Sequence, residues 1–269
     1  MIKSDDKPVM EWGSYSERLS ALLVMGEPLQ AHKLARRMLS QRAQFQSQAN
    51  RVLNDLYNLV HNFEIDDPEI KNLFDPCWIR KVNIAQVSSV VLDSFHTELK
   101  DALIDLGLEP DVAGFGNVDG AERLVLSEAA RAMKVPVIEQ LKTVVVHVAR
   151  KYKAQCDAAG YPSTFLRDRF TLKHFAHATR NGGHHFPHFH KNVMFVVAYY
   201  VDVPTETEAE IVLGGFARAG QPNLTAPPVA TRRPVTGDFI VFPGFHSHRT
   251  TPHQGPEMRI NMSFDVQPA

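Results

Sequence analysis

The chain has 269 residues, of which 44% are hydrophobic and 22% charged, and a formal net charge of −1 at pH 7. This composition is ordinary for a globular protein and excludes disorder over most of the chain. Because 29 Lys and Arg are balanced by 30 Asp and Glu, the sequence lacks the basic footprint of a nucleic-acid-binding protein. No apolar run approaches the roughly 20 residues that span a bilayer. We therefore expect a cytoplasmic protein without nucleic-acid or membrane partners.

The N-terminal part of the chain carries helical patterns. Ser14-Tyr15-Ser16-Glu17 has the form of a capping box, and apolar residues follow at three- and four-residue spacing until Gly26. A second such stretch begins at Pro28, and a third continues to about residue 62. We predict a helical hairpin or bundle over residues 1–65, tetratricopeptide-like at most, because no second copy follows. Its apolar stripe is compatible with docking on the rest of the chain, with a homodimer, or with a protein partner.

Residues 66–269 are expected to form a second domain that begins with supporting helices. Residues 63–83 contain Asp-Pro pairs typical of a connector. Helices within 84–160 are indicated by apolar spacing over Val87–Leu106 and again over Val137–Tyr152. The valines of the later stretch would suit a strand, but their spacing and the length of the stretch favour a helix.

After residue 164 the pattern changes to short strands. Arg169–Ala178 alternates polar and apolar residues, and Val193–Val203 is almost continuously apolar, as in a strand buried on both faces. Gly- and Pro-rich turns separate these two from further predicted strands at Ile211–Leu213, Asp238–Phe242 and Arg259–Val266. We predict an α+β protein with a β core over residues 165–266, in the form of a jelly roll with flanking helices.

Histidine is concentrated in this β region. Nine of the 13 histidines fall within residues 174–253, at positions 174, 177, 184, 185, 188, 190, 246, 248 and 253. A structural core has little use for so many ionisable rings, whereas imidazole is a common metal ligand. The sequence therefore predicts a metal site.

Four residues in order carry the chemistry of that site. His188 and His190 are two residues apart, so in an extended chain both imidazoles point to one face and can bind one ion. His248 follows at a distance, and Arg259 stands 11 residues later. Three ligands on one face of an octahedron leave room for a bidentate 2-oxo acid and dioxygen, and an arginine fork suits the far carboxylate of that acid. His185 or His246 could replace one of these ligands.

This set of residues resembles the Fe(II)/2-oxoglutarate-dependent oxygenases, and in particular the bacterial and phage oxygenases with an H-x-H pattern before a Tyr-Tyr strand. The matching segments are Arg180–His190, Ala198-Tyr199-Tyr200-Val201, and the Phe242-Pro243, His248, Arg259 and Ser263-Phe264 series. The resemblance covers residues 165–266 well and the preceding helices only loosely. It implies a double-stranded β-helix, the cupin-like form of the jelly roll.

The resemblance also implies roles for individual residues. Fe(II) would be held by His188, His190 and His248, and Arg259 would bind the C5 carboxylate of the cosubstrate 2-oxoglutarate. Further hydrogen-bonding candidates for the cosubstrate are Tyr199, Asn261 and Ser263. The commonest triad of these oxygenases has Asp or Glu where this chain has His190, so the site is one negative charge short.

The implied function is a dioxygenase that uses O2, releases succinate and CO2, and hydroxylates an unidentified small molecule, peptide or protein. Two other interpretations fit the same residues. One is a three-His, cupin-like dioxygenase that does not use 2-oxoglutarate. The other is a non-catalytic interaction module that holds structural zinc, for which His246 or His185 would supply a fourth ligand.

Overall fold

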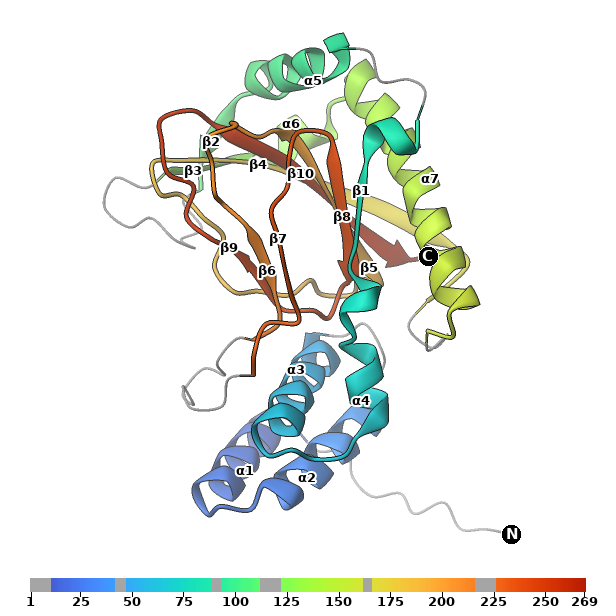
Figure 1. Cartoon of the computed structure of the whole chain (residues 1–269), viewed down its shortest axis with the longest axis vertical. Coiled ribbons are helices and arrows are strands. Elements are labelled where there is room, and N and C mark those ends of the chain that lie inside the picture. Colours follow the sequence, from blue (N-terminus) through green and yellow to red (C-terminus); the bar gives the residue numbers. More distant parts are fainter. Residues whose placement is uncertain (1–10, 42–46, 89–92, 112–121, 162–165, 216–225) are drawn as a thin grey trace.

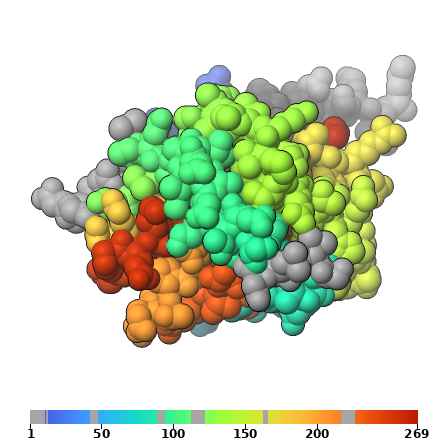
Figure 2. Space-filling model, turned by 90° about the horizontal axis from the view of Figure 1, so that it is seen from above, coloured from blue at the N-terminus to red at the C-terminus, as the bar shows by residue number. Residues whose placement is uncertain are grey.

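A computed structural model describes residues 11–41, 47–88, 93–111, 122–161, 166–215 and 226–269. Four helices gather at one end of the molecule, below two facing antiparallel sheets (Figure 1). Two further helices, α5 and α7, cover the larger sheet, and Figure 2 shows them side by side across the other end. None of the helices described is long and apolar enough to cross a bilayer.

The N-terminal helices are α1 (Trp12–Val24), α2 (Pro28–Ser40), α3 (Ser47–Asn62) and α4 (Pro68–Leu73). The predicted start of the second helix at Pro28 is confirmed. The predicted capping box is wrong, because α1 already begins at Trp12 and Ser14 lies within its first turn. Helix α4 interrupts the predicted connector, and the carboxylate of Asp67 caps it by accepting a hydrogen bond from the amide of Ile70.

The region predicted as supporting helices contains α5 (Asp93–Asp105), α6 (Glu128–Ala132) and α7 (Pro136–Ala158). Helix α7 confirms the helical interpretation of the valine-rich stretch. Short 3-10 turns at Pro76–Trp78 and Ile84–Gln86 flank a strand that the sequence patterns did not predict. That strand, β1 (Arg80–Asn83), and the equally unpredicted β2 (Leu108–Pro110) and β3 (Glu122–Leu126) all join the larger sheet.

The remaining strands follow in chain order. They are β4 (Phe170–Arg180), β5 (Phe195–Asp202), β6 (Ile211–Leu213), β7 (Ala230–Arg232), β8 (Asp238–Pro243), β9 (His248–Thr250) and β10 (Arg259–Pro268). Within the described residues, seven strands form an antiparallel sheet in the order β1-β8-β5-β10-β4-β3-β2, and three form a sheet in the order β7-β6-β9. All five predicted strands are present, whereas β7 and β9 were not predicted.

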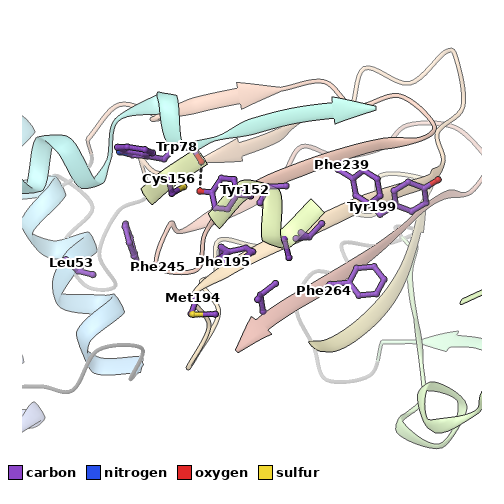
Figure 3. Close-up of a cluster of buried hydrophobic side chains, with 14 of the residues drawn as sticks. Leu53, Trp78, Tyr152, Cys156, Met194, Phe195, Tyr199, Phe239, Phe245 and Phe264 are labelled. Carbon is purple, nitrogen blue, oxygen red and sulfur yellow. Dashed lines mark hydrogen bonds between the residues drawn. The ribbon is translucent and has the colours of Figure 1, made fainter. Parts of the chain in front are cut away.

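Strand β5 separates two apolar layers, and its residues alternate between them. Phe195, Val197 and Tyr199 face the layer shared with α7, where Tyr152 packs on Phe195 and donates a 2.7 Å hydrogen bond to the carbonyl of Trp78 (Figure 3). Val196, Ala198 and Tyr200 face the smaller sheet and belong to the second layer. The space between the two sheets is therefore bordered by the second set of β5 side chains.

Candidate metal centre

Three histidines meet at one end of the space between the sheets. His188 and His190 lie on the extended segment between β4 and β5, and His248 is the first residue of β9. The backbones of His188 and His248 pair directly, since each amide donates to the other's carbonyl at 3.0 and 2.8 Å. One ring nitrogen from each of the three histidines lies within 4.8 Å of the other two. The structure thus brings together the three predicted ligands.

The Nδ1 atom of each ring is already engaged. Its partner is the carbonyl of Phe186 for His188 at 2.7 Å, the carbonyl of His246 for His248 at 3.1 Å, and the carboxylate of Asp265 for His190 at 2.5 Å. Because Nδ1–H donates in each case, Nε2 carries the lone pair and is the atom left to face a metal. The second hydrogen bond of each ring therefore orients it for coordination.

Burial keeps two of these rings neutral. It lowers the pKa of His188 to about 4, with a further contribution from His190. It also holds the pKa of His248 well below its usual range, and the neighbouring His188 and His190 act in the same direction. Only a neutral imidazole can donate a lone pair to a metal, so the protonation state at neutral pH suits ligation.

A cavity of about 250 Å³ extends from the three histidines between the sheets. One wall is apolar, with Val196, Ala198 and Phe242. Polar side chains and Phe175 line the remainder of the cavity; the polar residues include Arg123, His177, His185, Asn261 and Ser263. Asn261 and Ser263 thus lie where the sequence placed them, on the cavity face of β10. Their neighbours Ile260, Met262 and Phe264 pack into the opposite layer, since successive side chains of a strand point to opposite faces.

Arg259, the first residue of β10, is buried with 2% of its surface exposed. Its guanidinium carbon lies 5.1 Å from the ring centre of Tyr200, which lines the cavity. Among the residues that the structure describes, none accepts a hydrogen bond from its Nε or Nη2. Burial lowers the pKa of this guanidinium. A buried cation with two unused donors requires an anion, and a planar carboxylate matches the geometry of those donors.

The prediction for Tyr199 requires a correction. Its side chain lies in the layer beneath α5 and α7 beside Phe239 (Figure 3), and its hydroxyl is 2.8 Å from Nε2 of His96. Tyr200, the next residue, faces the cavity instead. Since successive side chains of a strand point to opposite faces, only one of the two tyrosines can contact a ligand in the cavity.

The alternative ligands take other positions. His246 is fully buried away from the three histidines, stacked on Phe74 of the α4 end at 4.9 Å, with Nε2 3.3 Å from the carbonyl of Leu73. His185 lines the cavity, but its ring centre is 6.1 Å from that of His188, and it is outside the group of converging nitrogens. In the described part of the chain three candidate ligands therefore converge, one fewer than the four protein ligands of a closed structural zinc site.

Sequence patterns missed two residues that support the site. Asp265 is the partner of His190, 75 positions away. Asn50 of α3 donates a 2.8 Å hydrogen bond to the carbonyl of His190, 140 positions away. Asn54, one turn later, donates to the carbonyl of Phe245 at 2.8 Å. Contacts over such separations leave no local signal in the sequence.

The comparisons with known proteins agree with this geometry. Residues 174–265 match the family described as Putative 2OG-Fe(II) oxygenase, and this segment contains all three histidines and Arg259. No curated protein matches the chain.

Solved structures are similar to the chain at low sequence identity. The α-ketoglutarate-dependent epimerase SnoN from nogalamycin biosynthesis matches with a TM-score of 0.50 at 15% identity, over 76% of this chain and 82% of SnoN. The carbocyclase SnoK from the same biosynthesis gives 0.49 at 11% identity, over 78% and 86%. A prolyl hydroxylase from Trichoplax adhaerens, in complex with a hypoxia-inducible-factor peptide, gives 0.47 at 14%, over 81% and 90%.

The two facing sheets and the likeness to SnoN confirm the predicted double-stranded β-helix with flanking helices. The family match relates the site to Fe(II)- and 2-oxoglutarate-dependent oxygenation, because the matched segment contains the converging histidines and the buried arginine. Residues 174–265 therefore match the 2-oxoglutarate- and Fe(II)-dependent oxygenases, a family whose members use Fe(II), 2-oxoglutarate and O2.

Proposed function

We propose that this protein hydroxylates an organic substrate, with His188, His190 and His248 as the Fe(II) ligands and Arg259 as the anchor of 2-oxoglutarate. The proposal rests on the three converging imidazoles together with the buried Arg259 guanidinium, which has two donors without a partner among the described residues and packs on Tyr200, a residue that lines the same cavity as the imidazoles. Folding alone does not explain the buried guanidinium, since its Nε and Nη2 have no hydrogen-bond partner in the part of the chain that the structure describes.

The donor set fits the iron. Neutral imidazoles are suitable ligands for Fe(II), and three of them on one side leave coordination positions open for a cosubstrate. When bound, Fe(II) and 2-oxoglutarate supply the oxidising chemistry, in which O2 delivers one oxygen atom to a substrate C–H bond and the other to succinate as CO2 leaves. The role of the chain is to bind, orient and exclude water.

Arg259 orients the cosubstrate in this proposal. Its unpartnered Nε and Nη2 would donate two hydrogen bonds to the distal carboxylate, while the ring of Tyr200 lies against the guanidinium and limits its movement. Asn261 and Ser263, one and two side chains further along the same face of β10, are positioned to hydrogen-bond the cosubstrate between Arg259 and the histidines. The apolar wall of Val196, Ala198 and Phe242 would keep bulk water from the reacting centre.

The size of the cavity limits the substrate. At about 250 Å³ it is at or below the low end of small-molecule pockets, which range from about 300 to 1,000 Å³. Once 2-oxoglutarate is bound, only a small group fits beside it. We propose that the reacting group is a compact molecule or a single side chain of a larger partner, and that it enters near Phe175 and Arg123 at the β3–β4 side.

The proposal is tested by anaerobic titration of the metal-free protein with Fe(II) and 2-oxoglutarate. The visible metal-to-ligand charge-transfer band of the chelate is recorded for the unaltered protein and for His248→Ala and Arg259→Ala. The matched controls are His147→Ala and Arg169→Ala, which alter an exposed histidine and an exposed arginine far from the cavity.

We expect a band in the unaltered protein and both controls, its loss in His248→Ala, and a higher 2-oxoglutarate requirement in Arg259→Ala. Tightly bound iron without a band would favour the three-His dioxygenase that does not use 2-oxoglutarate. Tightly bound zinc, with no response to iron or 2-oxoglutarate, would favour the non-catalytic module and contradict the proposal.

A further inference from the structure

The three imidazoles differ in the group that accepts a hydrogen bond from Nδ1. His188 and His248 each donate from Nδ1 to the carbonyl of the residue two positions before them. His190 instead donates to a carboxylate on another strand, that of Asp265 on β10. In the described part of the chain, this is the single charged partner within the ligand set. It lies behind the ligand that occupies the usual carboxylate position.

Asp265 is itself a costly residue to bury. Its side chain is 8% exposed, and within the described residues it forms no ion pair with lysine or arginine. A buried carboxylate needs a compensating positive charge or several hydrogen bonds, and in the part of the chain that the structure describes the partner of the Asp265 side chain is the His190 ring alone. A divalent cation at Nε2, on the far side of that ring, would provide a positive charge one ring away from the carboxylate.

We infer that Asp265 is a positioning residue for the metal: it fixes the His190 ring with Nε2 facing the ion and returns, through that ring, the negative charge that the three-His ligand set lacks. This inference rests on the proposed metal site and assigns it one more residue. A carboxylate behind a histidine ligand raises the basicity of the ring, and removal of such partners weakens metal binding by about 10- to 100-fold. In this arrangement the negative charge is supplied by the Asp265 carboxylate, which lies one imidazole ring further from the metal than a directly ligating carboxylate would.

Two substitutions separate the orienting effect from the charge. Asp265→Asn has nearly the same shape and keeps an acceptor for Nδ1–H, but it removes the charge. Asp265→Ala removes both. Asp238→Asn is the matched control, because Asp238 is also buried in the larger sheet but its partners are Lys81 and Asn83, away from the cavity. Thermal unfolding of each variant shows whether it is folded.

Three measurements test the inference. The dissociation constant of Co(II), used as a spectroscopic substitute for Fe(II), is measured against a competing chelator. The wavelength of the anaerobic Fe(II)·2-oxoglutarate band reports the electron density at the iron. Long-range 1H–15N spectra of the metal-free protein report which nitrogen of His190 carries the proton.

We expect Asp265→Ala to weaken Co(II) binding by about 10- to 100-fold and to release the fixed tautomer of His190. We expect Asp265→Asn to keep the tautomer, to weaken Co(II) binding by a smaller factor, and to move the band to shorter wavelength because the iron becomes less electron-rich. Asp238→Asn should change none of the three. Co(II) affinity and band position that are unaltered in folded Asp265→Asn would overturn the inference. Failure of the proposed metal site itself would be distinct, since the unaltered protein would then bind no Co(II).

Discussion

The side-chain amide of Asn50 on α3 donates a hydrogen bond to the main-chain carbonyl of His190, so the N-terminal helices hold the ligand segment directly. The same helix reaches the other ligand segment through Asn54, which binds the carbonyl of Phe245 three residues before His248. Further along α3, Tyr57 donates to the carbonyl of Pro227. The N-terminal helices are therefore attached to the site from its outside, over both segments that carry histidine ligands.

The first prediction concerns this attachment. Asn50→Ala should lower the stability of the His190 segment by about 1 kcal/mol, the net worth of one hydrogen bond, and weaken Co(II) binding by up to about fivefold. Asn62→Ala is the matched control, because Asn62 lies on the same helix but bonds only to the carbonyl of Asn58. Equal Co(II) affinities in the two variants, measured by chelator competition, would show that α3 does not support the metal site.

Arg259→Met should have opposite effects on binding and on stability. The loss of the guanidinium removes the partner of the cosubstrate carboxylate and should raise the dissociation constant of 2-oxoglutarate by about 30-fold or more, as expected for a truncated buried charge pair. In the absence of 2-oxoglutarate the same change removes a buried cation with unused donors, so the free energy of unfolding should rise by about 1–3 kcal/mol.

Calorimetric titration and denaturant unfolding of the metal-free protein measure the two effects. Arg169→Met, at an exposed site, should change neither. A ligand-free Arg259→Met protein that is less stable than the unaltered one would indicate that the guanidinium has a structural partner.

Substitutions of Tyr199 and Tyr200 should have different effects, one on the free energy of unfolding and the other on the binding of 2-oxoglutarate. Tyr200→Leu removes the ring against the Arg259 guanidinium, a contact worth about 0.5–2 kcal/mol, and should raise the dissociation constant of 2-oxoglutarate several-fold. Tyr199→Phe removes only the hydroxyl that bonds His96, and should lower the free energy of unfolding by about 1 kcal/mol without changing 2-oxoglutarate affinity. The reverse pattern would mean that β5 presents its other face to the cavity.

His246 and His248 should respond differently to replacement by phenylalanine. His246 stacks on Phe74 in a buried contact, so His246→Phe keeps an aromatic ring there and should leave Co(II) binding intact. His248→Phe removes a ligand nitrogen and should abolish tight binding. Cobalt titration followed by visible absorption compares them, and loss of binding in His246→Phe would make His246 a ligand in solution.

Stability should fall in acid, in part through His174. Burial, together with the positive charges of Lys142 and Arg131, lowers the pKa of this half-buried ring to about 4. The unfolded chain, with a pKa near 6.5 for histidine, binds more protons between those two values, so the free energy of unfolding decreases as pH falls from about 6.5 to about 4.

His174→Gln should remove on the order of 1–2 kcal/mol of this acid sensitivity, allowing for solvent screening of a half-exposed group. Denaturant unfolding at pH 7 and pH 4.5 gives the difference for both proteins. His147→Gln, at an exposed position on α7, is the control. An equal decrease in the unaltered protein and in His174→Gln would exclude His174 as a source of the acid sensitivity.

The sequence determined which residues could carry the chemistry. The order and spacing of His188, His190, His248 and Arg259 were enough to predict a metal site, because ligand type and local chain geometry fix which side chains can converge. The double-stranded β-helix was implied by the resemblance of these residues to the oxygenases. Helical periodicity likewise placed α2 and α7, whose apolar faces repeat over several turns.

The tertiary structure decided which neighbours complete the site. The sequence could not show which of Tyr199 and Tyr200 faces the cavity. Strand β5 is apolar on both faces, so no alternation of polar and apolar residues marks either face. Asp265 and Asn50 join the site only through sheet pairing and helix docking, across 75 and 140 residues. Strand β1 forms because the longer β8 provides its hydrogen bonds, whereas β7 and β9 are three-residue strands that pair with the equally short β6. Local sequence encodes the ligands, whereas the groups that orient them depend on long-range contacts formed only in the folded chain.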